Sequence, residues 1–313
     1  MIDLNKQDSI KRMLTNISAK KGRSVSEATR RTYFIYIRRF CDFYGGRTPD
    51  ELIEERKSDS KSDDIFINRR HEEKLKEFAD YFREEGYSSN TIATAAGAVK
   101  SLYASNYHPM VQVNIPSGQT IREPKIPTKE ELAQVIDMAH MPWHGAFMML
   151  NKECGISLGD MLALRFIDGS PIYGSIKDQL KKGQVPIHLK IIREKTGVKY
   201  DTFLGEDSFE LLNNAKFFPD ISSKSPNKRL FAYSTSTIQD AMRKLGSKLE
   251  WTKFSPGSLR KWFRTQLTLH DCNDALIEYM MGHLLGRVRG AYLVPPAQKL
   301  IEIYEKHYDA LRL

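Results

Sequence analysis

The chain contains 313 residues, of which 41% are hydrophobic, and 48 Lys and Arg against 39 Asp and Glu give it a formal net charge of +9. This length fits two domains or three, and the hydrophobic content excludes a disordered chain. Its three cysteines are widely spaced and no apolar run reaches about 18 residues, which excludes a disulfide scaffold, a zinc finger and a membrane-spanning protein. The cationic excess favours a polyanionic partner, most often nucleic acid.

The first 23 residues are polar and rich in Lys, and they lack the apolar core of a signal peptide. We therefore expect a loose arm and, given the sparse cysteines, a reducing cytoplasmic location. Ser24 and Glu27 then have the spacing of a capping box, and a helix is predicted from there to Gly45 and Gly46. Its apolar stripe consists of Tyr33, Tyr36, Ile37, Phe40, Phe43 and Tyr44.

Four arginines, Arg30, Arg31, Arg38 and Arg39, flank this stripe. They fit either a solvated basic face or a helix that lies against a phosphate backbone, and taken alone the solvated face is the better interpretation. Residues 55–64 then form a charged, Ser-rich stretch that is typical of a loop.

Two more helices complete a predicted all-helical bundle over residues 1–110. One carries Leu75, Phe78, Tyr81 and Phe82 and stops near Gly86. The other begins at residues 89–91 and carries Ile92, Ala96, Val99, Leu102 and Tyr103.

A Pro-rich and Gly-containing stretch over 111–127 predicts a linker, and Thr128 and Glu131 then form a capping box. A second domain is therefore expected over 128–313. The run 185–192, a turn at Lys195–Lys199 and the run 200–204 predict a strand, a turn and a strand. Helices are expected near 128–140, 143–152, 157–167, 207–215, 235–248, 257–269, 273–281 and 297–311. The predicted fold class is mainly α with a small β-sheet.

The segment 251–264 has four cations, Lys253, Arg260, Lys261 and Arg264, and no acid. Ser255 and Pro256 suit a helix start, and free backbone N–H groups at such a start bind phosphate well. A surface helix with Trp262 and Phe263 packed inward is the alternative, and both can hold. No acidic cluster at ligand spacing is present, which disfavours a metal-dependent nuclease.

Several motifs in order resemble the tyrosine recombinase, or phage integrase, family. They are SLGDMLALR at 157–165, Lys195 in the predicted turn, SLRKWFRTQL at 258–267, MMGH at 280–283, and Tyr292 nine residues after His283. Together with the helical bundle and the linker, the resemblance covers most of residues 24–311. It implies an N-terminal core-binding domain, a hinge and an α+β catalytic domain.

The resemblance implies that Tyr292 attacks a DNA phosphate, giving a 3′-phosphotyrosyl enzyme and a free 5′-hydroxyl that later reverses the step. Arg260 would hold the phosphate, His283 would donate a hydrogen bond and Lys195 would protonate the leaving oxygen, with no cofactor and no metal. Individually, these residues also fit a buried phenol, an ordinary helix-terminal histidine and a turn lysine. Relaxation of supercoils, as by a type IB topoisomerase, is a further alternative.

Two positions depart from the family pattern. Ser157 stands where the first catalytic arginine is expected, and Gly257 stands where a His or Lys is usual. Arg165 is eight residues further on, about 12 Å along a helix, which is too far to replace it, whereas Lys152 could reach in. We expect impaired cleavage with DNA binding retained, whether Ser157 is natural or engineered. A catalytically inactive DNA-binding relative is the main alternative.

The expected partner is double-stranded DNA, held between the two domains mainly through its phosphates. The candidate contacts are Arg30, Arg31, Arg38, Arg39, Lys100, Lys253, Lys261 and Arg264. After Tyr292, a helix carries Leu300, Ile301, Tyr304, Tyr308 and Leu311. The apolar face of this helix fits one of two arrangements. The helix folds onto its own domain, or it docks on a neighbouring protomer in a homotetramer on DNA, which the resemblance slightly favours. The chain is expected in the cytoplasm, at the nucleoid.

Overall fold

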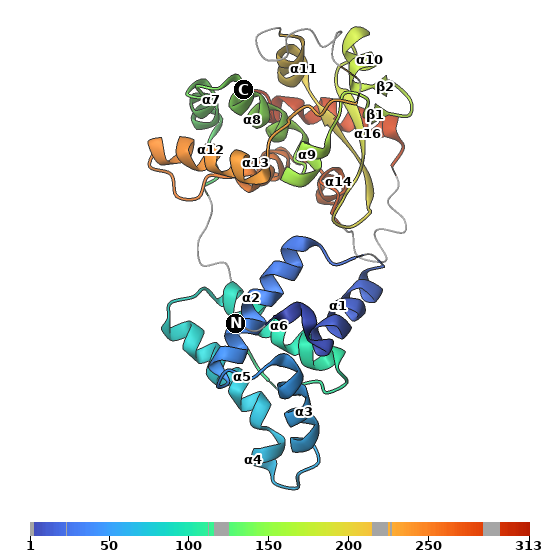
Figure 1. Cartoon of the computed structure of the whole chain (residues 1–313). Helices are drawn as coiled ribbons and strands as arrows, with labels where there is room; N and C mark the ends of the chain where they lie inside the picture. The colour runs from blue at the N-terminus through green and yellow to red at the C-terminus, as the bar shows by residue number, and fades with distance from the viewer. Residues whose placement is uncertain are drawn as a thin grey trace. The chain divides into compact units, whose positions relative to one another are not determined.

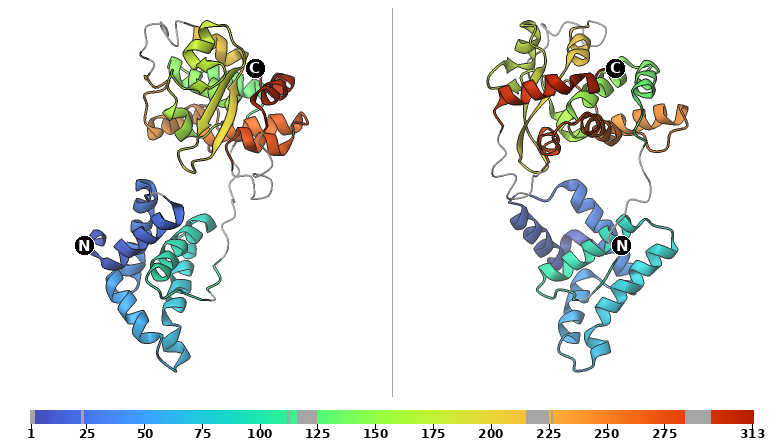
Figure 2. Two further views of the ribbon diagram at one scale, coloured as in Figure 1. Left: turned by 90° about the vertical axis from the view of Figure 1, so that its right-hand side faces the viewer. Right: turned by 180° about the vertical axis from the view of Figure 1, so that it is seen from behind.

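The computed structural model describes residues 3–22, 24–111, 113–115, 125–214, 225, 227–283 and 295–313. The chain forms two compact units, Met1–Glu123 and Pro124–Leu313. Both are mainly helical, and the second also contains two small antiparallel sheets of two strands each (Figures 1 and 2). The predicted fold class is therefore confirmed. No helix in the described ranges has the length and apolar character needed to cross a bilayer.

The first unit is an all-helical bundle around an aromatic core. Its elements are η1 (Leu4–Lys6), α1 (Asp8–Lys21), α2 (Glu27–Phe43), α3 (Pro49–Asp59), α4 (Ile65–Asn68), α5 (Arg70–Glu84) and α6 (Ser89–Ser105). Helix α6 packs against α1, α2 and α5, and Phe40, Phe78 and Phe82 are fully buried between them. This core follows the predicted apolar stripes.

The N-terminal segment is a docked helix and not the loose arm that its polar composition predicts. Leu4, Ile10 and Met13 are buried in the core of the first unit. The Asp50 carboxylate in α3 accepts hydrogen bonds from the backbone N–H of Asp8 at 3.1 Å and of Ser9 at 2.8 Å. An acid from another helix thus satisfies the first donors of α1.

Two further local predictions for this unit are wrong. The N-cap of α2 is Ser26, whose hydroxyl accepts from the Thr29 N–H, and not Ser24. The first half of the predicted loop at 55–64 belongs to α3, which a capping box at Thr48 starts. Two charged side chains of this half, Arg56 and Asp59, are buried, and Arg56 forms a buried ion pair with Glu72 at 2.7 Å.

The second unit contains most of the predicted elements. They are α7 (Lys129–Asp137), α8 (Pro142–Cys154), α9 (Leu158–Ala163), β1 (Gly169–Ser170), β2 (Gly174–Ser175), α10 (Ile176–Lys181), β3 (Ile187–Ile192), β4 (Lys199–Leu204), α11 (Glu206–Asn213), α12 (Thr235–Lys248), α13 (Pro256–Leu269), α14 (Asp274–Met280), α16 (Ala297–His307) and η2 (Tyr308–Ala310). The capping box at Thr128 is confirmed, and so is the hairpin, which pairs Ile187 with Leu204 and Ile192 with Lys199. The β1–β2 pair and α10 were not predicted.

The C-terminal helix packs on its own unit. Helix α16 lies against β4 (Figures 1 and 2), and Leu300, Tyr304, Tyr308 and Leu311 are buried in the core that also holds α8 and α13. The apolar face of this helix is therefore covered within one chain. This matches the alternative of a helix folded onto its own domain, and docking on a neighbouring protomer stays a prediction.

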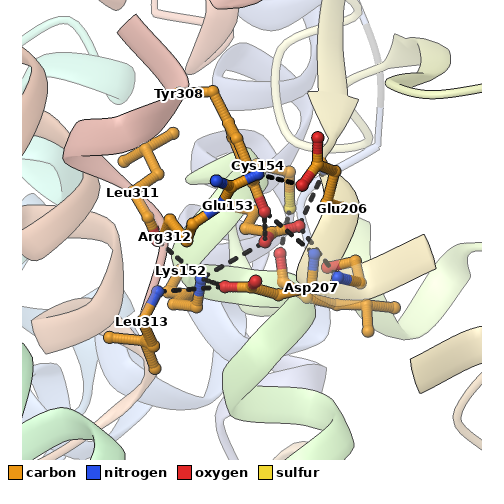
Figure 3. A network of polar contacts seen from close by, with 12 residues as sticks. Lys152, Glu153, Cys154, Glu206, Asp207, Tyr308, Leu311, Arg312 and Leu313 are labelled. Atoms are coloured by element: carbon orange, nitrogen blue, oxygen red, sulfur yellow. Dashed lines mark hydrogen bonds and ion pairs between the residues drawn. The ribbon is translucent and has the colours of Figure 1, made fainter. Parts of the chain in front are cut away.

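A buried polar network holds the C-terminal residues in place (Figure 3). The Lys152 ammonium donates to the Leu311 carbonyl at 2.6 Å and pairs with Asp207 at 2.8 Å. Glu153 accepts a hydrogen bond from the Tyr308 hydroxyl at 2.7 Å. Both charges are fully buried, and each is neutralised by opposite charge and by hydrogen bonds.

Candidate active site

Arg260 is fixed at the centre of the predicted site by three contacts from two segments of the second unit, the end of α8 and residues 281–283. Its guanidinium donates to the Gly155 carbonyl at 2.6 Å and the Met281 carbonyl at 2.7 Å, and it contacts Nε2 of His283 at 2.6 Å. Helix α13 also buries Trp262 and Phe263, as the inward-packing alternative predicted. The structure therefore places the Arg260 guanidinium and the His283 imidazole in direct contact.

Two glycines allow these backbone carbonyls to approach the site. Gly155 has φ +58° and ends α8, and a Cβ there would lie 2.4 Å from the Phe263 ring. Gly282 has φ +67°, and a Cβ there would lie 2.6 Å from the Tyr200 ring. Neither position accepts a side chain without strain and overlap. Packing against α13 and β4 thus requires glycine at both places.

His283 is held between Arg260 and Glu278. Its Nδ1 contacts the Glu278 carboxylate, which also pairs with Arg264 at 3.0 Å. Because a guanidinium can only donate, Nε2 of His283 accepts from Arg260, and this assigns the proton to Nδ1. To donate a hydrogen bond through Nε2, His283 therefore needs a proton on that nitrogen and also has to turn away from Arg260.

Ser157 acts as the N-cap of α9. Its hydroxyl donates to the Asp160 carboxylate at 2.7 Å and accepts from the Asp160 N–H at 3.3 Å. The buried Asp160 also accepts from the Glu194 N–H at 3.2 Å and from the Tyr200 hydroxyl at 3.3 Å. Asp160 thus ties the start of α9 to the β3–β4 hairpin, and Ser157 serves this local structure.

Arg193 is a second cation at the site, and the sequence reasoning missed it. It follows the last residue of β3 and donates to the Gly282 carbonyl at 2.7 Å. Burial lowers the pKa of Arg260, and the charge of Arg193 lowers it further. The signal in the sequence was an arginine at the end of a buried strand, two positions before Lys195.

The remaining predicted catalytic residues are less closely placed. Lys195 is exposed in the hairpin turn, and no contact in the described part of the chain joins it to Arg260. Gly257 lies exposed in the first turn of α13, where a Cβ would have as its nearest neighbour the Ser255 hydroxyl at 3.5 Å. Packing would therefore tolerate a larger residue there. Tyr292 lies outside the described residues.

The two cations weighed as substitutes for the missing arginine lie elsewhere. Lys152 points into the C-terminal network (Figure 3), where its ammonium bonds to Asp207 and to the Leu311 carbonyl, so the idea that it reaches into the site is wrong. Arg165 is exposed after the end of α9, in a backbone bridge with Arg229. Among the described residues, no group of three or more His, Cys, Asp or Glu side chains is placed to hold a metal ion.

The candidate DNA-binding cations differ in how free they are. Lys253, Lys261 and Arg264 are exposed on or beside α13, although Arg264 is paired with Glu278. In the first unit, Arg31 is exposed, and Arg39 is exposed with its guanidinium 5.1 Å from the rings of both Phe82 and Tyr87.

Three others in the first unit are less free. Arg30 contacts Asn5 and the Phe34 ring, and Arg38 is half-buried. The ammonium of Lys100 donates to the Val113 carbonyl at 2.8 Å and is thereby partly used within the protein.

Nearly the whole chain is similar in structure to DNA recombinases and integrases. It resembles the XerH site-specific recombinase bound to a palindromic difH substrate in a post-cleavage complex (TM-score 0.59, 15% identity, 95% of this chain and 88% of that chain). It also resembles a lambda integrase dimer bound to a COC′ core site (TM-score 0.59, 13% identity, 89% and 96%).

The Tn1549 transposon integrase in complex with circular intermediate DNA is a third similar structure (TM-score 0.55, 14% identity, 93% and 96%). The chain has the tyrosine recombinase fold. The sequence matches no protein-family model and none of the curated proteins with which it was compared.

Proposed function

We propose that the protein is a DNA strand transferase that cuts and rejoins duplex DNA through a covalent bond to Tyr292. The observation that carries this proposal is the fixed guanidinium of Arg260, held by two backbone carbonyls and His283. A guanidinium has more N–H donors than these contacts use, and the Nε–H and one N–H on Nη1 remain for a phosphate. The fold is consistent with such a role.

In the proposed reaction, the Tyr292 hydroxyl gives its proton to water, its oxygen bonds to the phosphorus, and the bond from phosphorus to the 5′-oxygen breaks. Lys195 gives its proton to the leaving oxygen, and Arg260 stabilises the charge on the non-bridging oxygens. The tyrosyl diester keeps the energy of the original diester, so a 5′-hydroxyl can reverse the step without ATP. His283 donates a hydrogen bond to the phosphate once its Nε2 carries a proton and the ring turns from Arg260 to the phosphate.

The proposal includes slowed cleavage because Ser157 provides no cation. Loss of one donor to the transition state typically lowers the rate about 10²–10³-fold. DNA affinity depends on many cations and should change little. A serine hydroxyl committed to capping α9 also favours the second candidate, a DNA-binding relative that does not cleave.

We further propose that cations of both units contact the phosphates of one duplex and that four copies act together on DNA at the nucleoid. Since counterions are released on binding, the affinity should fall steeply as salt rises from 50 to about 200 mM. A tetramer coupled through α16 would require this helix to leave its own core for that of a neighbour. Mass measurement of DNA complexes by light scattering would test the stoichiometry.

The direct test is covalent capture from a library of nicked duplexes with a randomised centre. The proposal predicts SDS-resistant adducts whose DNA becomes enriched in one sequence over successive rounds, with none formed by the Tyr292→Phe variant. Enrichment of a sequence by native binding, without any adduct, would instead establish the DNA-binding relative. The Ser157→Arg variant measures how much that position slows cleavage.

A further inference from the structure

We propose that Arg193 supplies a second guanidinium to the phosphate-binding site and so compensates in part for the arginine that is absent at position 157. This inference rests on the proposed function and deepens it by naming a further residue that touches the scissile phosphate. Arg193 comes from the β3–β4 hairpin, whereas position 157 lies at the start of α9. The cation would therefore reach the phosphate from a different element.

The first argument is position. Arg260 donates to the carbonyl of Met281 at 2.7 Å, and Arg193 donates to the carbonyl of the next residue, Gly282, also at 2.7 Å. His283 follows directly and contacts Arg260. Two guanidinium groups and an imidazole are thus fixed along three consecutive residues. Such a set of donors matches the several oxygens of one phosphate.

The second argument is the unused donor of Arg193. Its side chain is only 16% exposed, and its Nε is buried with no hydrogen-bond partner among the described residues. The carboxylate of Asp160 lies 3.9 Å from Nε, which is beyond hydrogen-bond distance. A buried donor without a partner costs free energy, and a phosphate oxygen would satisfy it.

The third argument is charge balance. The described contacts of Arg260 are to two neutral carbonyls and an imidazole, and Arg193 bonds another neutral carbonyl. Asp160 is the nearby buried acid, and it also receives bonds from Ser157, Tyr200 and the backbone. Burial is the main cause of the lowered pKa of Arg260, and repulsion from Arg193 lowers that pKa further. An anion bound between them would remove this repulsion.

The test separates contact with the phosphate from a structural role. In the Tyr292→Phe background, the affinities of a selected duplex with and without the scissile phosphate are compared, using a gap that removes that phosphate. The ratio of these two affinities measures the benefit of the phosphate, and Arg193→Ala should reduce this ratio about tenfold. Arg165→Ala, which removes an exposed arginine of the same unit, should leave the benefit unchanged. Circular dichroism checks that both variants are folded.

Cleavage gives the second readout. With Tyr292 present, Arg193→Ala should slow adduct formation about 10²-fold on a phosphate diester, and Arg193→Lys should slow it less. A methylphosphonate lacks the charge that Arg193 is proposed to stabilise, so on that substrate Arg193→Ala should lose less than about tenfold. Adding Ser157→Arg to the Arg193→Ala variant should speed adduct formation at least about tenfold. The same substitution in the unmodified protein should speed adduct formation by a smaller factor.

The outcomes distinguish the two proposals. If no duplex is bound at all, both the proposed function and this inference fail. If duplex is bound and Arg193→Ala keeps the full benefit of the scissile phosphate, the inference fails alone. If duplex is bound without any adduct, the comparison of duplexes with and without the phosphate still decides the role of Arg193. An equal loss of rate on phosphate and methylphosphonate would make Arg193 a structural residue and overturn the inference.

Discussion

Replacing Asp160 by Asn should destabilise the second unit without lowering the DNA affinity of the protein. The carboxylate is buried, lies 3.9 Å from Nε of Arg193, and accepts hydrogen bonds from Ser157 and Tyr200. At this distance, unit charges attract by about 4 kcal/mol at an effective dielectric constant of about 20. Burying a neutral amide costs less desolvation free energy than burying a carboxylate, and this difference offsets roughly half of the lost attraction. The expected decrease in the free energy of unfolding is therefore about 2–3 kcal/mol.

Urea unfolding followed by tryptophan fluorescence measures this decrease, because all three tryptophans, Trp143, Trp251 and Trp262, belong to the second unit. The matched control is Asp240→Asn, which removes an exposed carboxylate 2.9 Å from Arg243 and should cost less than about 0.5 kcal/mol. DNA affinity should stay equal or rise, since the variant gains positive charge. A cost for Asp160→Asn no larger than that of the control would refute the reasoning.

Three further predictions concern other charges. Glu153→Gln leaves Lys152 with fewer buried partners and should lower stability by about 2–3 kcal/mol in the same fluorescence assay; an unchanged midpoint would contradict the network. Burial opposes ionisation of Asp201, but hydrogen bonds from His188 and a tyrosine hydroxyl hold its pKa below the usual value. The free energy of unfolding should therefore decrease as the pH falls below about 5, and it should decrease less steeply in Asp201→Asn. Parallel plots of this free energy against pH for the two proteins would exclude Asp201 as the cause. Asp50→Asn should weaken α1 by about 1 kcal/mol, seen as faster amide hydrogen exchange in that helix alone.

Patterns that depend on neighbours in sequence were predicted well. Helix α12 has the predicted bounds of 235–248, and the turn at Lys195 joins two paired strands as the β-branched runs indicate. The Thr128 cap follows from two residues three positions apart. In these cases local hydrogen bonds and apolar periodicity decide the structure, and both can be read directly from the sequence.

Features that depend on distant partners were missed. Helix α1 is polar overall and docks through Ile10 and Met13, while an acid from α3 satisfies its first donors. The contact of Arg193 with Gly282 spans 89 residues, so its place beside Arg260 depends on how the hairpin packs and not on any local pattern. The apolar face of the C-terminal helix predicts that this face is covered, but it does not indicate whether the same chain or a neighbouring chain covers it.

The covalent bond between Tyr292 and DNA is the central claim, and mass spectrometry of the captured adduct tests it most directly. After nuclease and protease digestion, the account predicts a single modified peptide that carries a nucleotide joined through its 3′-phosphate to Tyr292. Attachment through a 5′-phosphate, attachment to another side chain, or no modified peptide from a duplex that the protein binds tightly would contradict the account.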